Sequence, residues 1–290
     1  MSFLQLIRFK NLVILALVQA LFSWVITAKL GQSIYWLDLL LLIQATVLLA
    51  AAGNVINDFF DVVADTINKP SKVLVGTVYA KKTVLHIYTV LNFFGIASGV
   101  LLAYLQDKVL YALWFVIVAV LLFMYSKFFK KIALLGNLMV SFLIALSVWL
   151  LVVFPPFHTA VLEKFTIYLI GVYGVFAFSI NLLREIVKDM EDMKGDYSQN
   201  VKSLPILIGI EKTQTVVFML SFIPFAGSLW TVYVLGDVFA ILYFIVLISM
   251  PLGYFMYQIR RVKTVTRMHT LSTLLKLIML FGILSISFLR

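Results

Sequence analysis

The sequence predicts an all-α membrane protein whose nine transmembrane helices surround a central cavity. Three observations lead to this fold class. Of the 290 residues, 63% are hydrophobic and only 12% are charged, unlike a soluble domain. Apolar runs of about 20 residues, the length that crosses the hydrocarbon of a bilayer, recur along the chain. Basic residues gather on alternate connections between these runs, as in polytopic membrane proteins.

The apolar runs define the spans in order, and no polar stretch between them is long enough to fold separately. We therefore expect one domain over residues 1–290, with two long Asp-rich cytoplasmic loops at about 57–83 and 184–213. A basic lead-in and the first run resemble a signal peptide, but many more runs follow, which favours a retained span. The predicted spans are about 12–29, 37–56, 84–105, 109–126, 132–154, 165–183, 214–235, 238–257 and 272–289.

The loops predict the orientation. Nineteen of the 23 basic residues fall on one side, and the other side holds only Lys29, Lys108, Lys164 and Arg290. By the positive-inside rule, the N-terminus is cytoplasmic and the C-terminus lies outside, which agrees with an odd number of spans. We expect contacts with membrane lipids and none with nucleic acid. The sequence does not predict the oligomeric state.

Cysteine and histidine usage excludes several kinds of chemistry. The chain has no cysteine, which rules out disulfides, a thiolate nucleophile and thiolate metal ligands. Three scattered histidines leave little for a zinc site.

An acidic pattern occurs twice, each time in the last turns of a span and the start of a long loop. The first acidic motif, residues 54–65, reads N-V-I-N-D-F-F-D-V-V-A-D, and the second, residues 185–196, reads E-I-V-K-D-M-E-D-M-K-G-D. The spacing Asp-x2-Asp-x3-Asp recurs 131 residues later, and Asn54 corresponds to Glu185. Both motifs are expected to continue as helix and to break at 68–70 and 195–205. On a helix, the first set shares a face roughly 60° wide.

Three carboxylates on one helical face repel one another unless a cation binds them. Oxygen ligands without nearby histidine or cysteine suit Mg²⁺, which also coordinates phosphate oxygens. Basic residues beside the motifs, such as Lys72, Arg184, Lys188 and Lys202, suit the remaining charge of a diphosphate. The alternative is that each motif is a solvated helix end, as we expect for the off-face Glu191.

A diphosphate head beside an apolar cavity predicts a polyprenyl diphosphate substrate. Bound Mg²⁺ and cationic side chains would assist departure of the diphosphate, leaving an allylic cation for an acceptor to attack. A transporter for divalent cations or phospholipids is a different interpretation, although its ionisable groups would lie near the middle of the membrane. A non-catalytic lipid-binding scaffold is a third interpretation.

The motifs and their order resemble those of the UbiA superfamily of intramembrane prenyltransferases. The matching stretches are residues 54–70 and 181–205, with weaker matches at 7–11 and 125–137. The resemblance implies nine helices around a cavity open to lipid, Mg²⁺ held by both acidic motifs, and a prenyl diphosphate between them. It is closest to the geranylgeranylglycerol-phosphate geranylgeranyltransferase branch. That branch uses geranylgeranyl diphosphate and a prenylglycerol phosphate, whereas other members use aromatic acceptors of quinone, chlorophyll or tocopherol-like pathways.

The resemblance also implies roles for individual residues. Catalytic roles fall on Asp58, Asp61, Asp189 and Asp192. Metal ligands are Asn54, Asp58, Asp61, Asp65, Asp189, Asp192 and Asp196. Substrate-binding residues are Arg8, Asn11, Lys72, Tyr125, Lys130, Asn181, Arg184, Lys188 and Lys202.

Two positions depart from the family pattern. Ser71 and Lys72 follow N-K-P where the family often has an arginine, so either Lys72 serves there or the contact is lost. A Tyr-x3-Lys pattern would need lysine at 129, where Phe129 stands. Lys130 or Lys127 substitutes in that position.

Overall fold

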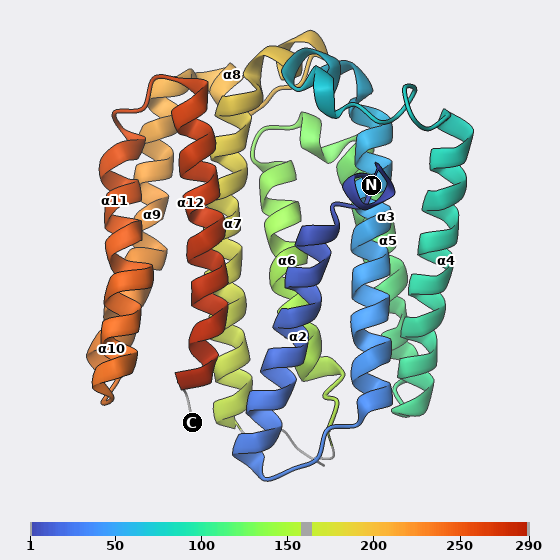
Figure 1. Cartoon of the computed structure of the whole chain (residues 1–290), viewed down its shortest axis with the longest axis vertical. Helices are drawn as coiled ribbons and strands as arrows, with labels where there is room; N and C mark the ends of the chain where they lie inside the picture. Colours follow the sequence, from blue (N-terminus) through green and yellow to red (C-terminus); the bar gives the residue numbers. More distant parts are fainter. Residues whose placement is uncertain (1, 158–163, 289–290) are drawn as a thin grey trace. The chain divides into compact units, whose positions relative to one another are not determined.

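The computed structural model describes residues 2–157 and 164–288, and within these ranges it contains helices and no β-strand (Figure 1). In this part of the chain, nine helices are long and apolar enough to cross a membrane. The predicted all-α class and the nine spans are therefore confirmed. The central cavity and the orientation of the termini stay predictions.

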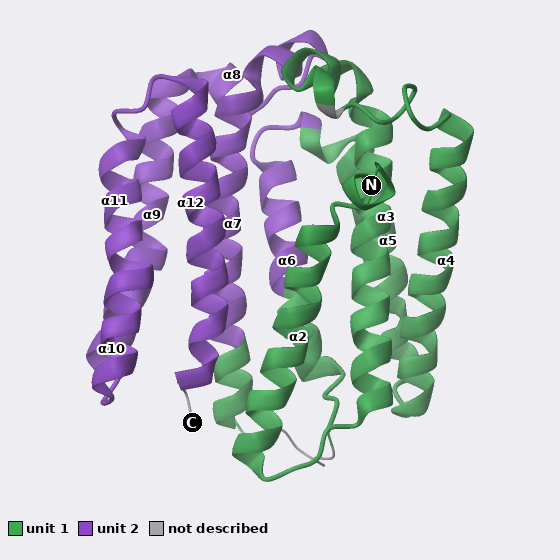
Figure 2. Ribbon diagram, viewed as in Figure 1, with its two compact units in different colours: residues 1–130, 146–170 green, residues 131–145, 171–290 purple. Residues whose placement is uncertain are grey.

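The chain divides into two compact units (Figure 2). Unit 1 consists of residues 1–130 and 146–170, and unit 2 of residues 131–145 and 171–290. The single domain over residues 1–290 stays a prediction.

In unit 1, helix α3 packs against α2, α4 and α5. Glycine permits close approach between these helices, as is usual in membranes. A Cβ added at Gly95 would lie 3.0 Å from Leu49, and one at Gly99 would lie 2.3 Å from the ring of Phe115. The helices of this unit are α1 (Ser2–Leu6), α2 (Phe9–Leu30), α3 (Trp36–Asn68), α4 (Lys81–Leu105) and α5 (Leu113–Lys127), with 3₁₀ turns η1 (Pro70–Lys72) and η2 (Val109–Ala112).

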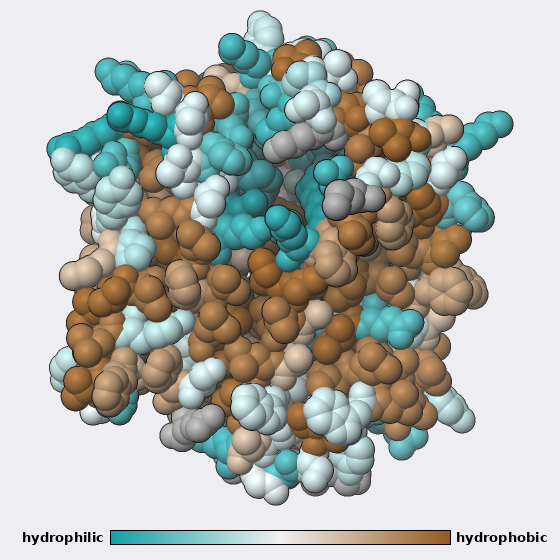
Figure 3. All heavy atoms as spheres, viewed as in Figure 1, coloured by the Kyte–Doolittle hydropathy of each residue, from teal (hydrophilic) through white to brown (hydrophobic). Residues whose placement is uncertain are grey.

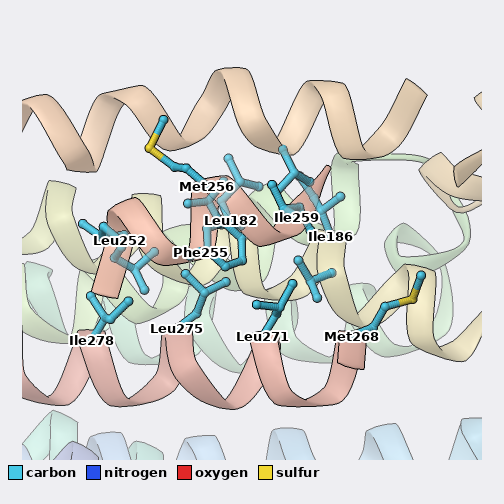
Figure 4. Close-up of a cluster of buried hydrophobic side chains, with 14 of the residues drawn as sticks. Leu182, Ile186, Leu252, Phe255, Met256, Ile259, Met268, Leu271, Leu275 and Ile278 are labelled. Carbon is cyan, nitrogen blue, oxygen red and sulfur yellow. The ribbon is translucent and has the colours of Figure 1, made fainter. Parts of the chain in front are cut away.

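Unit 2 has its own hydrophobic core, shown in Figure 4, to which α7, α11 and α12 contribute Ile186, Phe255 and Leu275. Pro251, in the first turn of α11, lacks an N–H for the preceding turn, and a π-helical turn lies immediately before that helix. The helices are α7 (Lys164–Ser198), α8 (Leu204–Ile208), α9 (Ile210–Val234), α10 (Val238–Phe244), the π turn η4 (Ile245–Ser249), α11 (Met250–Ile259), α12 (Val265–Leu284) and the 3₁₀ turn η5 (Ser285–Phe288). The units share the 3₁₀ turn η3 (Phe129–Lys131), α6 (Leu135–Val153) and α7, whose residues 164–170 belong to unit 1.

The helices agree with the predicted spans except where polar residues extend them. Helix α12 begins at Val265, seven residues before the predicted span, because its first turns are polar and carry no hydropathy signal. Thr264 caps that end, and its hydroxyl accepts a hydrogen bond from the backbone N–H of Arg267 at 3.4 Å.

Helices α3 and α7 are longer than a membrane span. With 33 and 35 residues, they are about 50 Å long at about 1.5 Å per residue, against about 30 Å of hydrocarbon. Both acidic motifs lie in the C-terminal half of these helices, so the extra length carries them. The predicted continuation of helix through both motifs is confirmed.

Local chemistry ends each long helix where the sequence predicts a break. Lys69 leaves the helical region of backbone conformation because Pro70 follows it. Helix α7 ends in a Schellman motif, in which Asn200 takes a left-handed conformation with φ 55°. The N–H groups of Asn200 and Val201 then donate to the carbonyls of Tyr197 and Asp196.

Buried polar contacts tie helices of unit 1 together. The Gln19 side chain is fully buried, donates to the carbonyl of Ser147 and accepts from the Thr46 hydroxyl at 2.8 Å. At the other end of α3 from the acidic motif, Gln106 donates to Asp38 at 2.8 Å. On the face that Figure 3 shows, hydrophobic side chains cover much of the helices, as expected for surfaces that contact lipid.

Replacing Gly99 by alanine should destabilise the protein. The added Cβ would lie 2.3 Å from ring atoms of Phe115, and overpacking of this kind costs about 1–3 kcal/mol. We expect a lower thermal midpoint for Gly99→Ala than for the wild type, measured on protein purified in detergent.

Gly227→Ala is the matched control for this substitution. Its new Cβ meets no packed neighbour within 4 Å, and alanine favours a helix more than glycine does. We expect its midpoint to be unchanged or raised. A Gly99→Ala midpoint equal to that of the wild type would contradict the close contact between α4 and α5.

Candidate functional site

The first acidic motif lies on the last turns of α3, and its predicted face is formed. Asn54, Asp58, Asp61 and Asp65 are all half-buried on that helix. Two other segments of unit 1 contact this face, the turn between α1 and α2 and the 3₁₀ turn η3.

The turn between α1 and α2 brings Arg8 to the motif. Arg8 takes a left-handed conformation with φ 54°, and its Nη2 donates to Oδ1 of Asp58 at 2.9 Å. Asn54 Nδ2 donates to the carbonyl of Ile7 at 2.9 Å, so the same turn is held at two points. Ile7 itself is buried in a cluster with Val55. Burial of this turn therefore positions the guanidinium beside a carboxylate.

Asp61 has two hydrogen-bond partners. One of them is Lys130, which distinguishes it from Lys127, the other lysine that the sequence offered for this position. Lys130 Nζ donates to Oδ1 of Asp61, and Asn57 Nδ2 donates to Oδ2 at 2.7 Å. Lys127 instead lies over the ring of Phe128, with 5.0 Å from Nζ to the ring centroid. The structure thus brings Lys130 to the motif and leaves Lys127 on an aromatic surface.

The second acidic motif lies on α7 in unit 2. Glu185 accepts from Arg184 at 2.7 Å and from Lys188 at 3.0 Å, so both predicted diphosphate contacts pair with the first residue of the motif. Asn137 from α6 donates to Oδ2 of Asp189 at 2.9 Å. The side chains of Asp192 and Asp196 are half-buried on the same stretch of helix.

The remaining predicted residues have varied surroundings. The side chain of Asn181 is buried, and its Nδ2 donates to the hydroxyl of Ser141 at 3.2 Å. Tyr125 is half-buried on α5, within electrostatic reach of Arg8. Lys202 and Asn11 are exposed. The side chain of Lys72 lies outside the described part of the chain.

The structure contradicts one expectation, the solvated side chain of Glu191. Only 8% of this side chain is exposed, and it contacts His269 of α12, with 3.1 Å between Oε1 and Nδ1. Packing of α12 against α7 buries a position that lies off the predicted face. That packing has no signal in the sequence of the motif.

Two asparagines that contact the acidic motifs were missing from the predicted site. Asn57 lies four residues before Asp61 on the same helix, a spacing at which side chains meet, so the sequence contained a signal for it. Asn137 comes from another helix, and only the fold brings it to Asp189. Within residues 2–157 and 164–288, no three carboxylate or histidine side chains converge as a metal site. The motifs do supply oxygen ligands together with cationic donors.

Comparison with known proteins places the chain among prenyltransferases. Residues 16–280 match the UbiA prenyltransferase family. The chain is 30% identical over 299 residues to the digeranylgeranylglyceryl phosphate synthase of Saccharolobus solfataricus, covering 98% of this chain and 95% of the relative. It is 31% identical over 248 residues to the enzyme of that name from Sulfurisphaera tokodaii, covering 82% and 83%.

Solved structures similar to this chain agree with the family match. A structure described as giving insights into digeranylgeranylglyceryl phosphate synthase in membranes has a TM-score of 0.71 and 25% identity, covering 98% of this chain and 96% of that one. A UbiA homolog from Archaeoglobus fulgidus bound to DMAPP and Mg²⁺ has a TM-score of 0.62, with 99% of each chain covered. At 16% identity the latter supports the fold alone. The resemblance predicted from the acidic motifs is confirmed, and the chain belongs to the UbiA prenyltransferase family.

Proposed function

We propose that this chain transfers a geranylgeranyl group from its diphosphate to a prenylglycerol phosphate in the membrane, with Mg²⁺ as cofactor. The observation that carries the proposal is the make-up of the acidic motifs. Each combines several carboxylates with cationic side chains, on a helix that is longer than the membrane is thick. The relatives named digeranylgeranylglyceryl phosphate synthase support the same substrate class.

The donor set fits Mg²⁺. The ligands we assign are Asn54, Asp58, Asp61 and Asp65 in the first motif and Asp189, Asp192 and Asp196 in the second. All are oxygen donors, which hard cations prefer. Bound Mg²⁺ would neutralise charge on the departing diphosphate.

Cationic side chains complete the anion-binding chemistry. Arg8 and Lys130 reach the first motif, and Arg184 and Lys188 lie in the second. The Nε of Arg184 is buried and has no hydrogen-bond partner among the described residues. A buried donor without a partner costs about 1–3 kcal/mol, and a phosphate oxygen of the substrate would satisfy it.

The reaction breaks one bond and forms another. The bond between C1 of the prenyl chain and the diphosphate oxygen breaks, and both of its electrons leave with the diphosphate. The glycerol hydroxyl oxygen then bonds to C1 of the allylic cation and loses its proton. Cationic side chains of the motifs stabilise the negative charge that develops on the leaving group.

The orientation of the site belongs to the same proposal. The connections that carry both acidic motifs hold most of the basic residues, which by the positive-inside rule lie in the cytoplasm. We therefore place the reaction at the cytoplasmic face.

Removing a motif carboxylate should abolish transfer. With labelled geranylgeranyl diphosphate and geranylgeranylglycerol phosphate, we expect wild-type protein to form a lipid-soluble ether, and EDTA to stop the reaction. Asp58→Asn and Asp192→Asn each remove one negative charge at an assigned ligand. We expect each to lower turnover by about 10²–10³-fold, as when a group that stabilises transition-state charge is lost.

Asp38→Asn is the control on the same helix as Asp58. Its carboxylate accepts a hydrogen bond from Gln106 at the opposite end of α3, so turnover should stay near the wild-type value. Near-normal turnover in both Asp58→Asn and Asp192→Asn would refute the assignment of the two acidic motifs to the catalytic site. Transfer to a hydroxylated aromatic acceptor, with none to the glycerol phosphate, would refute the acceptor.

The two candidate lysines on α5 and η3 should behave differently. Lys130→Met removes the cation that contacts Asp61, whereas Lys127→Met removes one that lies on aromatic rings. We expect Lys130→Met to raise KM for the prenyl diphosphate or lower kcat at least tenfold, and Lys127→Met to change neither by more than about threefold, the scale of a solvent-exposed contact. A larger effect of Lys127→Met than of Lys130→Met on KM or kcat would assign the diphosphate-binding role to Lys127.

Labelling tests the orientation, because the chain contains no cysteine of its own. Lys81→Cys at the start of α4 and Ser33→Cys between α2 and α3 introduce single exposed thiols. In inside-out vesicles, an impermeant maleimide should label position 81 and spare position 33. The opposite labelling would overturn the cytoplasmic placement.

A further inference from the structure

A buried asparagine in unit 2 donates a hydrogen bond to a carboxylate of the second acidic motif. Asn137 lies in the first turn of α6 with only 8% of its surface exposed, and its Nδ2 donates to Oδ2 of Asp189 at 2.9 Å. Asp189 lies on α7, far away in sequence. The contact therefore depends on how α6 and α7 pack.

The chemistry of the pair fixes how the amide is oriented. An ionised carboxylate only accepts hydrogen bonds, and an amide has one donating and one accepting end. Only the NH₂ group of Asn137 can face Asp189 without repulsion. Oδ1 of Asp189 has no hydrogen-bond partner among the described residues, so the contact engages one oxygen and leaves the other available.

Asn137 is a neutral partner of a motif carboxylate, like Asn57 beside Asp61, whereas the ion-paired carboxylates have cationic partners. Arg8 and Lys130 pair with Asp58 and Asp61, and two cations pair with Glu185. Each of those contacts cancels charge. A hydrogen bond from an amide orients the carboxylate and favours its ionised form, and it brings no positive charge that would compete with a metal.

The surroundings hold Asn137 in place. The Ser141 hydroxyl donates to the backbone carbonyl of Asn137 at 2.6 Å, and Asn181 Nδ2 donates to the Ser141 hydroxyl oxygen at 3.2 Å. Both Ser141 and Asn181 are buried. Just before α6, Leu134 takes a left-handed conformation with φ 63°, which residues other than glycine rarely adopt. Leu134 also packs against the core of unit 2, which anchors the start of the helix.

We propose that Asn137 is a positioning residue for Asp189, and that Ser141 and Asn181 support it. Its amide holds one oxygen of the carboxylate and so orients the group that we assign to Mg²⁺. Partners of this kind around metal ligands typically change metal affinity by about 10–100-fold when they are removed. The inference rests on the proposed function, since it needs Asp189 to bind the metal.

The test compares three variants of the full-length protein. Asn137→Leu has nearly the same size without a donor, and Asn137→Gln keeps the amide. Asn92→Leu is the control, because Asn92 makes a similar part-buried hydrogen bond, but to the backbone carbonyl of Tyr88 on its own helix α4 and not to a motif carboxylate. Mn²⁺ serves as a paramagnetic substitute for Mg²⁺, with binding followed by electron paramagnetic resonance. The Mg²⁺ concentration for half-maximal transfer is measured in parallel.

We expect Asn137→Leu to weaken Mn²⁺ binding and to raise the half-saturating Mg²⁺ concentration, each by about 10–100-fold. High Mg²⁺ should restore much of its turnover, and its thermal midpoint should fall no further than that of Asn92→Leu. Asn137→Gln should recover part of the loss. Asn92→Leu should bind Mn²⁺ as the wild type does.

Two results would overturn the inference. The first is wild-type metal affinity in Asn137→Leu. The second is loss of the folded state in both Asn137 variants, which would make the residue purely structural. An Asp189→Asn arm separates the two proposals. Weak metal binding in Asp189→Asn with normal binding in Asn137→Leu refutes only the positioning role, whereas normal binding in both refutes the assignment of Asp189 to the metal.

Discussion

The hydrocarbon of the membrane is the constraint on which the rest of the structure depends. Unpaired backbone groups and isolated charges are costly in it, so the chain crosses as helices and its acids gather at helix ends. Helices α3 and α7 meet this constraint by exceeding the length of a span, with 33 and 35 residues. Their extra turns carry both acidic motifs. An apolar scaffold and a polar site can therefore share one continuous helix, which positions the carboxylates rigidly.

The two motifs offset the electrostatic repulsion among their carboxylates in different ways. In the first, cations arrive from distant segments, and the buried turn before α2 and the 3₁₀ turn after α5 deliver Arg8 and Lys130. In the second, Glu185 pairs with neighbours on its own helix, and a neutral amide from α6 reaches Asp189. These contacts reduce repulsion among the carboxylates and hold them in defined orientations. Membership of the UbiA prenyltransferase family gives this arrangement a chemical purpose, since prenyl transfer requires groups that bind a diphosphate.

The sequence by itself determined the fold class, the nine spans, the helical continuation of both motifs and the break at Pro70. These features follow from properties read along one dimension: hydropathy over a length set by the bilayer, side-chain spacing on a helix, and the backbone restriction before proline. Asn57 could also have been found this way, because it lies one helical turn from Asp61.

Only the tertiary structure decided which side chains meet the carboxylates. It chose Lys130 over Lys127, set Arg8 on Asp58, buried Glu191 against His269 and brought Asn137 to Asp189. All of these partners come from segments that are distant in sequence from the motif. A difference of three residues between Lys127 and Lys130 changes which surface each side chain reaches. Such contacts depend on how the helices pack, and the spacing of residues within a motif does not predict that packing. The physical reason is that hydrophobicity acts on whole segments, whereas hydrogen bonds and ion pairs act between single atoms that only the packed helices bring together.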